Sequence, residues 1–178
     1  MIKRLFGLSP VIYHYRSPRS KKVAGVTISS ATVVEFLLSK GFKKGNKVKQ
    51  QVGIPDWISN RIEFSKSCLR GLIDTDGGVY FHRHKSHGCG CFNIGLQLTN
   101  KSIPILTFTK DIFSQLNFTP KPNKKSVNLY RESEVYRYAK EIKFHNPYHI
   151  RRLIKFAKQK TAFLGGVHRI GKVHAWRA

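Results

Sequence analysis

One helical run limits the folds that this chain can adopt. From about Asn60 to Asp76, apolar residues recur at helical spacing, and Leu69 and Ile73 belong to a stripe that would face a core. The pair Gly77–Gly78 ends the run, and the alternating segment VYFHRH follows it directly. A long helix that leads straight into a strand predicts a protein of the α+β class, with this helix packed at its core.

A second face of this helix consists of small residues. Ser67, Gly71 and Thr75 recur at every fourth position. Small side chains allow the backbone of another helix to approach closely, in water as in lipid. A glycine within a helix costs about 1 kcal/mol relative to alanine, so its presence favours a packing role. We therefore predict that these three residues form a helix interface, with a second helix in contact at Gly71.

The last turn of the helix carries two acids, Asp74 and Asp76, in a chain with 33 Lys and Arg against nine Asp and Glu. A carboxylate near a helix C-terminus is destabilising by about 0.3–1 kcal/mol unless a cation compensates it. The letters DGG are typical of a helix exit in which Gly77 adopts the left-handed conformation. That conformation accounts for the glycines, but it does not explain why acids precede them.

The formal net charge of +24 exceeds what solubility requires and makes the compact state repel itself. A polyanionic partner would neutralise the excess, and nucleic acid is the first candidate. A ribosomal-type structural protein and a membrane-surface binder are the alternatives. Against the membrane surface, Lys and Arg are spread over the whole length, and no basic amphipathic segment has a separate apolar face.

The sequence also bears on the compartment. No apolar run reaches the roughly 18 residues that span a bilayer, and the start MIKRLFGLSP lacks the apolar core of a signal peptide. We therefore expect no membrane partner. The cysteines Cys68, Cys89 and Cys91 are odd in number and lack the spacing of a secreted disulfide framework. They predict a reducing compartment, either cytoplasmic or in an organelle matrix.

Outside this helix, the chain alternates between strand and helix patterns. Runs of period two predict strands at Val11–Arg16, at Val26–Ser29, at VYFHRH, at Phe92–Thr99 and at SVNLYR. Helical spacing predicts helices at Thr32–Phe42, Ile103–Leu116, Ser133–Ile142 and Tyr148–Lys158. The segment KKGNKVKQQVGIPDWIS is rich in Gly, Lys and Gln, which is typical of a loop or linker.

Two segments of the chain resemble each other in element order. A helix tail, a hairpin ending in VTIS and the helix TVVEFLLSKGF are matched by DIFSQLNF, a hairpin ending in VNLY and SEVYRYAKEIKF. A chance similarity between common α+β patterns is the alternative. We interpret residues 1–50 as a partial first repeat, 51–59 as a linker, 60–160 as a complete repeat and 161–178 as a basic C-terminal tail.

The segment LRGLIDTDG, from Leu69 to Gly77, resembles the LAGLIDADG signature of homing endonucleases, with seven of nine letters the same and departures at Arg70 and Thr75. The segments GFKKGNKVKQQVGIPDWI and NPYHIRRLIKF are similar to those that flank the signature in this family. The resemblance implies an αββαββα half-domain with an antiparallel sheet that lies in the DNA major groove. It also implies that signature helices pair at a two-fold or pseudo-two-fold axis.

The same resemblance implies roles for individual residues. Asp76 is expected to bind a divalent cation, Mg²⁺ or another, while Asp74 supports the helix end. Mg²⁺ prefers oxygen ligands and keeps several waters, so one or two carboxylates suffice. Gln97 matches the strand residue that orients water, with a merely solvated residue as the alternative. Lys47 and Arg152 match basic residues near the scissile phosphate. For each the alternative is a simple phosphate contact, and an arginine cannot shuttle a proton.

Polar and aromatic side chains on the predicted hairpins are candidates for contacts with DNA phosphates or base edges. These candidates are Tyr13, His14, Arg16, Tyr80, His82, Arg83, His84, Lys85, Asn93, Thr99, Asn128, Tyr130 and Arg131. A solvated surface is the alternative for each. Zinc is a minor alternative at the second hairpin, with His82, His84, His87, Cys89 and Cys91 as candidate ligands. Trp57 is expected to fill a core position instead of stacking on bases.

As a whole, the resemblance implies a metal-dependent endonuclease that cleaves a long, specific site in double-stranded DNA and is encoded by an intron or intein as a mobile element. Cleaving both strands requires two acids, and this chain has one signature. We favour the interpretation that the chain is the carboxyl-terminal part of a two-motif enzyme, in which case it would be inactive alone. The alternatives are that it pairs with a second polypeptide or that it homodimerises with its amino-terminal segment rearranged. A non-cleaving binder on the same fold is the alternative, either an intron RNA maturase or a transcription regulator.

Overall fold

The computed structural model describes residues 2–16, 22–86 and 89–164. Helices and antiparallel sheets are combined in it, which confirms the predicted α+β class. The chain divides into two compact units, an N-terminal unit, Met1–Gly45, and a C-terminal unit, Asn46–Ala178. Residues 46–50, which we assigned to the first repeat, therefore group with the C-terminal unit. None of the described helices is long and apolar enough to cross a membrane.

The N-terminal unit is built from α1 (Ile2–Phe6), β1 (Val11–Arg16), β2 (Lys22–Thr27) and α2 (Ala31–Ser39). Its two strands pair antiparallel, with Tyr13 opposite Gly25. None of the described side chains in this unit is buried, and Val26 and Phe36 are each 52% exposed. Because an isolated two-stranded hairpin is at best marginally stable in water, the described side chains of this unit contribute little burial to its stability.

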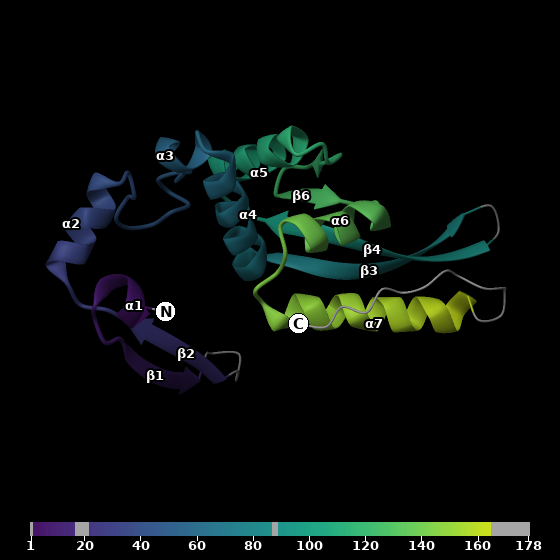
Figure 1. The fold of residues 1–178 in the computed structure, drawn as a ribbon, viewed down its shortest axis with the longest axis horizontal. Helices are drawn as coiled ribbons and strands as arrows, with labels where there is room; N and C mark the ends of the chain where they lie inside the picture. Colours follow the sequence, from purple (N-terminus) through teal and green to yellow (C-terminus); the bar gives the residue numbers. More distant parts are fainter. Residues whose placement is uncertain (1, 17–21, 87–88, 165–178) are drawn as a thin grey trace. The chain divides into compact units, whose positions relative to one another are not determined.

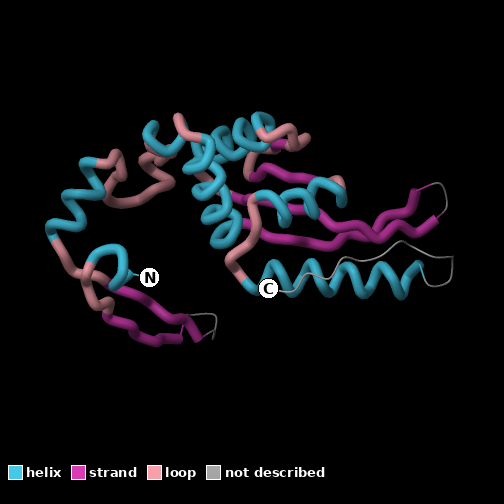
Figure 2. The backbone as a smooth tube through the Cα atoms, in the orientation of Figure 1, coloured by secondary structure: helices cyan, strands magenta, loops and turns pink. Residues whose placement is uncertain are grey.

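The C-terminal unit contains a four-stranded antiparallel sheet with the strand order β3-β4-β6-β5 (Figure 1). Its elements are α3 (Asp56–Ser59), α4 (Ile62–Asp76), β3 (Gly77–Ser86), β4 (Cys89–Thr99), α5 (Ile103–Gln115), β5 (Lys121–Pro122), β6 (Ser126–Leu129), α6 (Glu132–Glu141) and α7 (Pro147–Leu164). The β3–β4 hairpin forms the long part of the sheet (Figure 2). Helix α3 lies inside the predicted linker, where Pro55 and the acid Asp56 favour a helix start.

The core lies on the helix-covered face of this sheet. Ile94, Leu96 and Leu98 of β4 are at most 1% exposed, as the period-two pattern predicts. Leu69 and Ile73 of α4 are fully buried and belong to the same cluster. Burying an apolar side chain of this size stabilises the fold by about 1.5–3 kcal/mol relative to leaving it exposed. The core therefore holds α4, and with it the signature segment, firmly against the sheet.

The two segments that resemble each other do share an element order. The first runs α1–β1–β2–α2 and the second runs α5–β5–β6–α6. In the second, Val127 and Leu129 are at most 1% exposed, whereas Val26, the counterpart of Val127, is 52% exposed. The same order of elements therefore has a core in the C-terminal unit, whereas the described side chains of the N-terminal unit form none.

Trp57 does not fill a core position. Its side chain is 46% exposed, so that expectation is wrong. The ring meets Phe64 edge-on with centroids 5.9 Å apart, and the guanidinium of Arg61 lies 5.5 Å from the centroid of the Phe64 ring. The connection from α3 to α4 thus forms an aromatic surface of the unit.

Candidate metal and nucleic-acid site

A tight junction between α4 and β3 fixes the end of the signature helix. Gly77 has φ −96° and ψ −177°, so the chain passes from helix to strand through extended backbone, and the expected left-handed conformation is wrong. A Cβ atom on Gly77 would lie 2.7 Å from the carbonyl oxygen of Ile73 and 2.9 Å from that of Gln97. The glycine is needed because two backbone segments approach each other here.

Asp76, the last residue of α4, presents a partly exposed carboxylate. Its side chain is 37% exposed, and Oδ2 accepts hydrogen bonds from Lys47 Nζ at 3.3 Å and from Asn100 Nδ2 at 3.2 Å. No described residue donates a hydrogen bond to Oδ1. The ammonium group of Lys47 compensates the unfavourable position of a carboxylate at a helix C-terminus. The protein thus holds one oxygen of Asp76, while the other has no donor among the described residues.

Lys47 reaches Asp76 from a turn at the start of the C-terminal unit. The side chain of Asn46 shapes this turn, because its Oδ1 accepts hydrogen bonds from the N–H groups two and three residues later, both at 3.0 Å. Gln51 fastens the turn to the start of α5, where its Oε1 accepts a hydrogen bond from the N–H of Ile103 at 2.9 Å. The structure therefore brings together two residues that the sequence singles out, Lys47 and Asp76, although 29 positions separate them.

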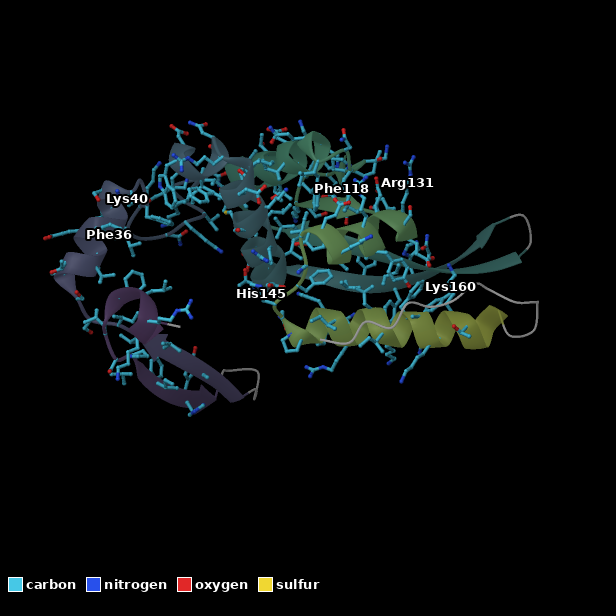
Figure 3. All side chains as sticks on the ribbon, viewed as in Figure 1. Phe36, Lys40, Phe118, Arg131, His145 and Lys160 are labelled. Atoms are coloured by element: carbon cyan, nitrogen blue, oxygen red, sulfur yellow. The ribbon has the colours of Figure 1, made fainter. Side chains whose placement is uncertain are left out.

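Asp74 has a different environment. Its Oδ2 accepts a hydrogen bond from the N–H of His145 at 2.9 Å, and its carbonyl oxygen accepts one from Asn146 Nδ2 at 2.9 Å. Both donors lie between α6 and α7, and Figure 3 shows His145 beside the end of α4. Asp74 thus joins the signature helix to the start of α7 through Oδ2, while its Oδ1 is buried without a hydrogen-bond partner among the described residues; Asp76 is the more exposed acid of the pair.

Gln97 lies close to this junction along the sheet. It pairs with Gly78 in the register of β3 and β4, on the face opposite the buried residues of β4. Its Nε2 donates a hydrogen bond to Ser126 Oγ at 3.2 Å, which fixes the amide. The side chain is half-buried, so its amide oxygen can serve a water or a ligand at the end of the sheet where Asp76 lies.

Further aromatic and polar candidates extend this open face along the hairpin. Tyr80 and His82 lie two positions apart on the same face of β3, with ring centroids 5.8 Å apart. Tyr130 is 46% exposed, and its carbonyl oxygen accepts a long hydrogen bond from Asn93 Nδ2 at 3.5 Å. Thr99 is exposed at the other end of β4. Rings and amides of this kind suit contacts with phosphates, sugars and bases.

Tyr80 crosses the sheet over Gly95. The two residues are opposite in register, and a Cβ on Gly95 would lie 2.4 Å from the Cζ of the ring, so the ring occupies the space above the glycine. Burial raises the pKa of Tyr80 to about 12, and the electrostatic interaction with the neighbouring Tyr130 acts in the same direction. The hairpin of the N-terminal unit repeats the arrangement, since Tyr13 covers Gly25 at 2.3 Å.

We expect Tyr80→Phe to reduce the alkaline loss of stability. The pKa of a tyrosine is near 10 in the unfolded chain and that of Tyr80 is about 12 in the fold, so the wild type loses stability as the pH rises through this window. Burial raises the pKa of Tyr138 as well, so part of the loss persists in the variant. Thermal unfolding between about pH 9 and about pH 12 measures the effect. Identical pH profiles for both proteins would contradict the position of Tyr80 over Gly95.

Asn128 is 1% exposed, so the expectation that it contacts DNA is wrong. Its Nδ2 donates hydrogen bonds to Ser126 Oγ at 3.0 Å and to the carbonyl oxygen of Lys121 at 3.4 Å. Lys121 lies on the short edge strand β5, directly opposite Asn128. By alternation the side chain of Asn128 belongs to the open face, but it is buried there and its amide bonds to the neighbouring edge strand.

Arg152 lies on the helix-covered side of the sheet. Its guanidinium lies 4.6 Å from the ring centroid of Phe81, and Nη1 donates a hydrogen bond to the hydroxyl of Tyr148 at 3.0 Å. Phe81 pairs with the core residue Ile94, so this stacking is on the opposite face from Gln97. The expected place of Arg152 near the scissile phosphate therefore gains no support from its contacts.

The remaining candidates are distributed over both units. Tyr13 and His14 are exposed on β1, and Arg131, labelled in Figure 3, is exposed and donates from Nη1 to Thr119 Oγ1 at 3.2 Å. The side chains of Arg16, Arg83, His84, Lys85, His87, Cys89 and Cys91, and with them most zinc candidates, lie outside the part of the chain that the structure describes. Among the described residues, no group of three or more His, Cys, Asp or Glu could hold a metal ion.

The small-residue face of α4 is open within the described chain. Ser67, Gly71 and Thr75 are all exposed, and a Cβ on Gly71 would meet no atom within 4 Å. The hydroxyls of Ser67 and Thr75 donate to the carbonyl oxygens of Glu63 and Gly71, both at 3.0 Å. Because these hydroxyls are satisfied inside the helix, another helix can cover the face without leaving them unpaired. The second helix that we expected at Gly71 is not among the described residues.

Asn100 and Ser102 belong to the site, and the periodicity of the sequence gives no sign of them. An Asn two residues before a Ser, just after a strand, is typical of a turn closed by the asparagine side chain. Asn100 Oδ1 does accept a hydrogen bond from the N–H of Ser102 at 2.9 Å. That local signal predicts the turn, but it does not predict that the same amide reaches Asp76, 24 positions away.

In comparisons with known proteins, no protein-family model and no curated protein matches the chain.

Proposed function

We propose that this chain is a subunit of a LAGLIDADG-type homing endonuclease, which hydrolyses phosphodiester bonds at a specific site in double-stranded DNA with Mg²⁺ or another divalent cation. The observation that carries the proposal is Asp76, an exposed carboxylate at the end of a helix whose small-residue face is open. Asp76 is one of nine acids in a chain with 33 Lys and Arg, and one of its oxygens has no donor among the described residues, so it can take a divalent cation beside its ion pair with Lys47.

The chemistry of the donor set fits such a cation. Asp76 offers one carboxylate oxygen that no described residue occupies. Mg²⁺ keeps several waters and takes phosphate oxygens as ligands, so a single protein carboxylate per chain is sufficient. When bound, the cation would neutralise charge on the phosphate and make a water nucleophilic. Lys47 would contact the same phosphate, and Gln97 would orient the attacking water.

The open face of the sheet supplies the binding surface in this proposal. Tyr80, His82 and Tyr130 lie on it or at its edge, and the chain carries 33 Lys and Arg. Neutralising phosphates releases counterions, so a charge of this size favours a long duplex as the partner. A two-stranded β-ribbon is also an element that the DNA major groove admits.

Cleavage of both strands requires a second acid beside Asp76. A second signature helix packed on the face of Ser67, Gly71 and Thr75 would bring that acid to the same place. The helix would come from a second copy of the chain or from another polypeptide that carries the missing half.

We expect Gly71→Val to prevent this pairing without unfolding the chain. The space around Gly71 is open in the C-terminal unit, so a valine there meets no clash, whereas it would hold a partner helix away. Sedimentation velocity should show a loss of the larger species, with a melting temperature within about 3 °C of the wild type. Ser114→Val, on the exposed side of α5, is the matched control and should leave the mass unchanged. If neither substitution changes the mass of the assembly in solution, the chains do not pair through the face of Gly71.

The proposal is tested with plasmids that carry the locus of the protein's own gene in interrupted and uninterrupted form. The purified protein, as a homodimer or together with the polypeptide that carries the missing half, should linearise one of them in the presence of Mg²⁺ and neither in the presence of EDTA. Specific binding without cutting at any Mg²⁺ concentration would replace the proposal by the non-cleaving alternative.

That alternative, an intron RNA maturase or a transcription regulator on the same fold, is favoured by one observation. Asp76 Oδ2 already receives hydrogen bonds from Lys47 and Asn100, an arrangement that holds the carboxylate without a metal. A binder of this kind would keep its affinity for nucleic acid in EDTA and would show no Mg²⁺-dependent product.

A further inference from the structure

A buried amide supports the exposed carboxylate of Asp76. Asn100 follows β4, is 6% exposed, and donates from Nδ2 to Asp76 Oδ2 at 3.2 Å. Its Oδ1 accepts a hydrogen bond from the N–H of Ser102 at 2.9 Å, and its own N–H donates to the carbonyl oxygen of Lys125 at 3.1 Å. Because the N–H of Ser102 can only donate, the amide oxygen has to face it. The NH₂ group of Asn100 therefore has to face Asp76.

The turn that carries Asn100 also holds the segment that carries Lys47. Ser102 is fully buried, and its Oγ donates to the carbonyl oxygen of Val52 at 2.7 Å. The N–H of Val52 in turn donates to the carbonyl oxygen of Lys47 at 3.1 Å. A series of short contacts thus runs from Asp76 through Asn100 and Ser102 to the backbone of Lys47.

We infer that Asn100 is a positioning residue, which selects the side-chain orientation of Asp76 and leaves Oδ1 as the oxygen that binds the divalent cation. The inference rests on the proposed function, because that function supplies the divalent cation that the oriented carboxylate would bind. A carboxylate at the end of a helix has several rotamers, and a buried donor on one oxygen selects among them at little further entropic cost. Loss of such a partner of a metal ligand typically costs about 10–100-fold in metal affinity.

The first test measures the Mg²⁺ dependence of cleavage in Asn100→Ser. A serine keeps an oxygen for the turn to Ser102 but is too short to reach Asp76. The Mg²⁺ concentration for half-maximal cleavage should rise about 10–100-fold, while the rate at saturating Mg²⁺ stays within about threefold of the wild type. A rate that is lowered equally at every Mg²⁺ concentration, or an unchanged Mg²⁺ requirement, would overturn the positioning role.

The second test uses the full chain without DNA. Asn100→Asp keeps the acceptor for Ser102 but sets a second carboxylate against Asp76, so the melting temperature at neutral pH should fall by about 5 °C. Ca²⁺ should raise it more than it raises that of the wild type, because two facing carboxylates bind the cation together. The double variant Asp76→Asn with Asn100→Asp restores one donor and one acceptor and should recover the wild-type melting temperature.

These two tests separate the inference from the proposed function. Failure of the wild type to cleave when its second half is present would overturn the proposed function, and the melting temperatures would still show whether Asn100 and Asp76 contact each other. If Asn100→Asp melts like the wild type, or if the double variant recovers no stability relative to Asn100→Asp, the inference is wrong even for an active nuclease. Should Asn100→Asp fail to fold, the double variant alone decides, since only a direct contact lets the second change restore folding.

Discussion

Asp76→Asn is expected to lower the rate of DNA cleavage by at least about 100-fold, because a divalent cation contributes several kcal/mol to phosphoryl chemistry and an amide holds it poorly. Affinity for DNA should stay equal or rise slightly, since the change removes a negative charge from a basic surface. The fold should tolerate it, because the ion pair with Lys47 is exposed and contributes at most about 1 kcal/mol. Cleavage of a plasmid substrate and a binding assay at equal salt measure the two effects.

Asp111→Asn is the matched control for this variant. Asp111 is an exposed carboxylate on α5, beside Lys110, and has no part in the proposed site. Its substitution should leave both cleavage and binding unchanged. If Asp76→Asn loses DNA binding and cleavage together, Asp76 has a structural role and the nuclease proposal fails.

Gly77→Val should give the largest loss of stability, about 3 kcal/mol or more. The first carbon of the side chain would lie 2.7 Å from the carbonyl oxygen of Ile73 and 2.8 Å from its Cα, and no flexible side chain can move away. The helix end and the adjoining strand would have to separate, which would also displace Asp76. Urea unfolding of the full chain, followed by circular dichroism, measures the loss.

The neighbouring glycine provides the control. A Cβ on Gly78 would meet no atom within 4 Å, and valine favours a strand, so Gly78→Val should stay within about 0.5 kcal/mol of the wild type. Equal effects of the two substitutions would show that the chain leaves α4 differently from the junction described here.

Features that depend on neighbours in sequence could be predicted well. The helix expected from Asn60 to Asp76 is observed from Ile62 to Asp76, and the one expected at Ile103–Leu116 is observed at Ile103–Gln115. The two helices are 15 and 13 residues long, and each buries one face in the core, so a pattern that repeats along the helix predicts it well. The alternation in β4 likewise predicted which side chains enter the core.

Features that depend on distant segments could not be predicted from local pattern. A glycine after a helix can be required by a left-handed turn or by the close approach of another backbone segment. At Gly77 the second reason applies, because strand β4 lies opposite it, and local sequence does not show this. Alternation places Asn128 on the open face, but its burial and its hydrogen bond to the edge strand depend on a segment across a turn. Arg152 has the right charge for a phosphate contact, yet the packing of α7 turns it onto Phe81. The support of Asp76 by Asn100 likewise depends on a turn formed after β4.

In the proposed assembly, the open face of α4 would set the distance between the two acids. Thr75 and Asp76 are adjacent, so the register in which a second helix meets the small residues also decides how far apart the two acids stand. Sliding that helix by one turn would move its acid by about 5.4 Å. The packing of the two helices would then fix the distance along the DNA between the two strand breaks. Every target would be cut with the same overhang, whatever its sequence.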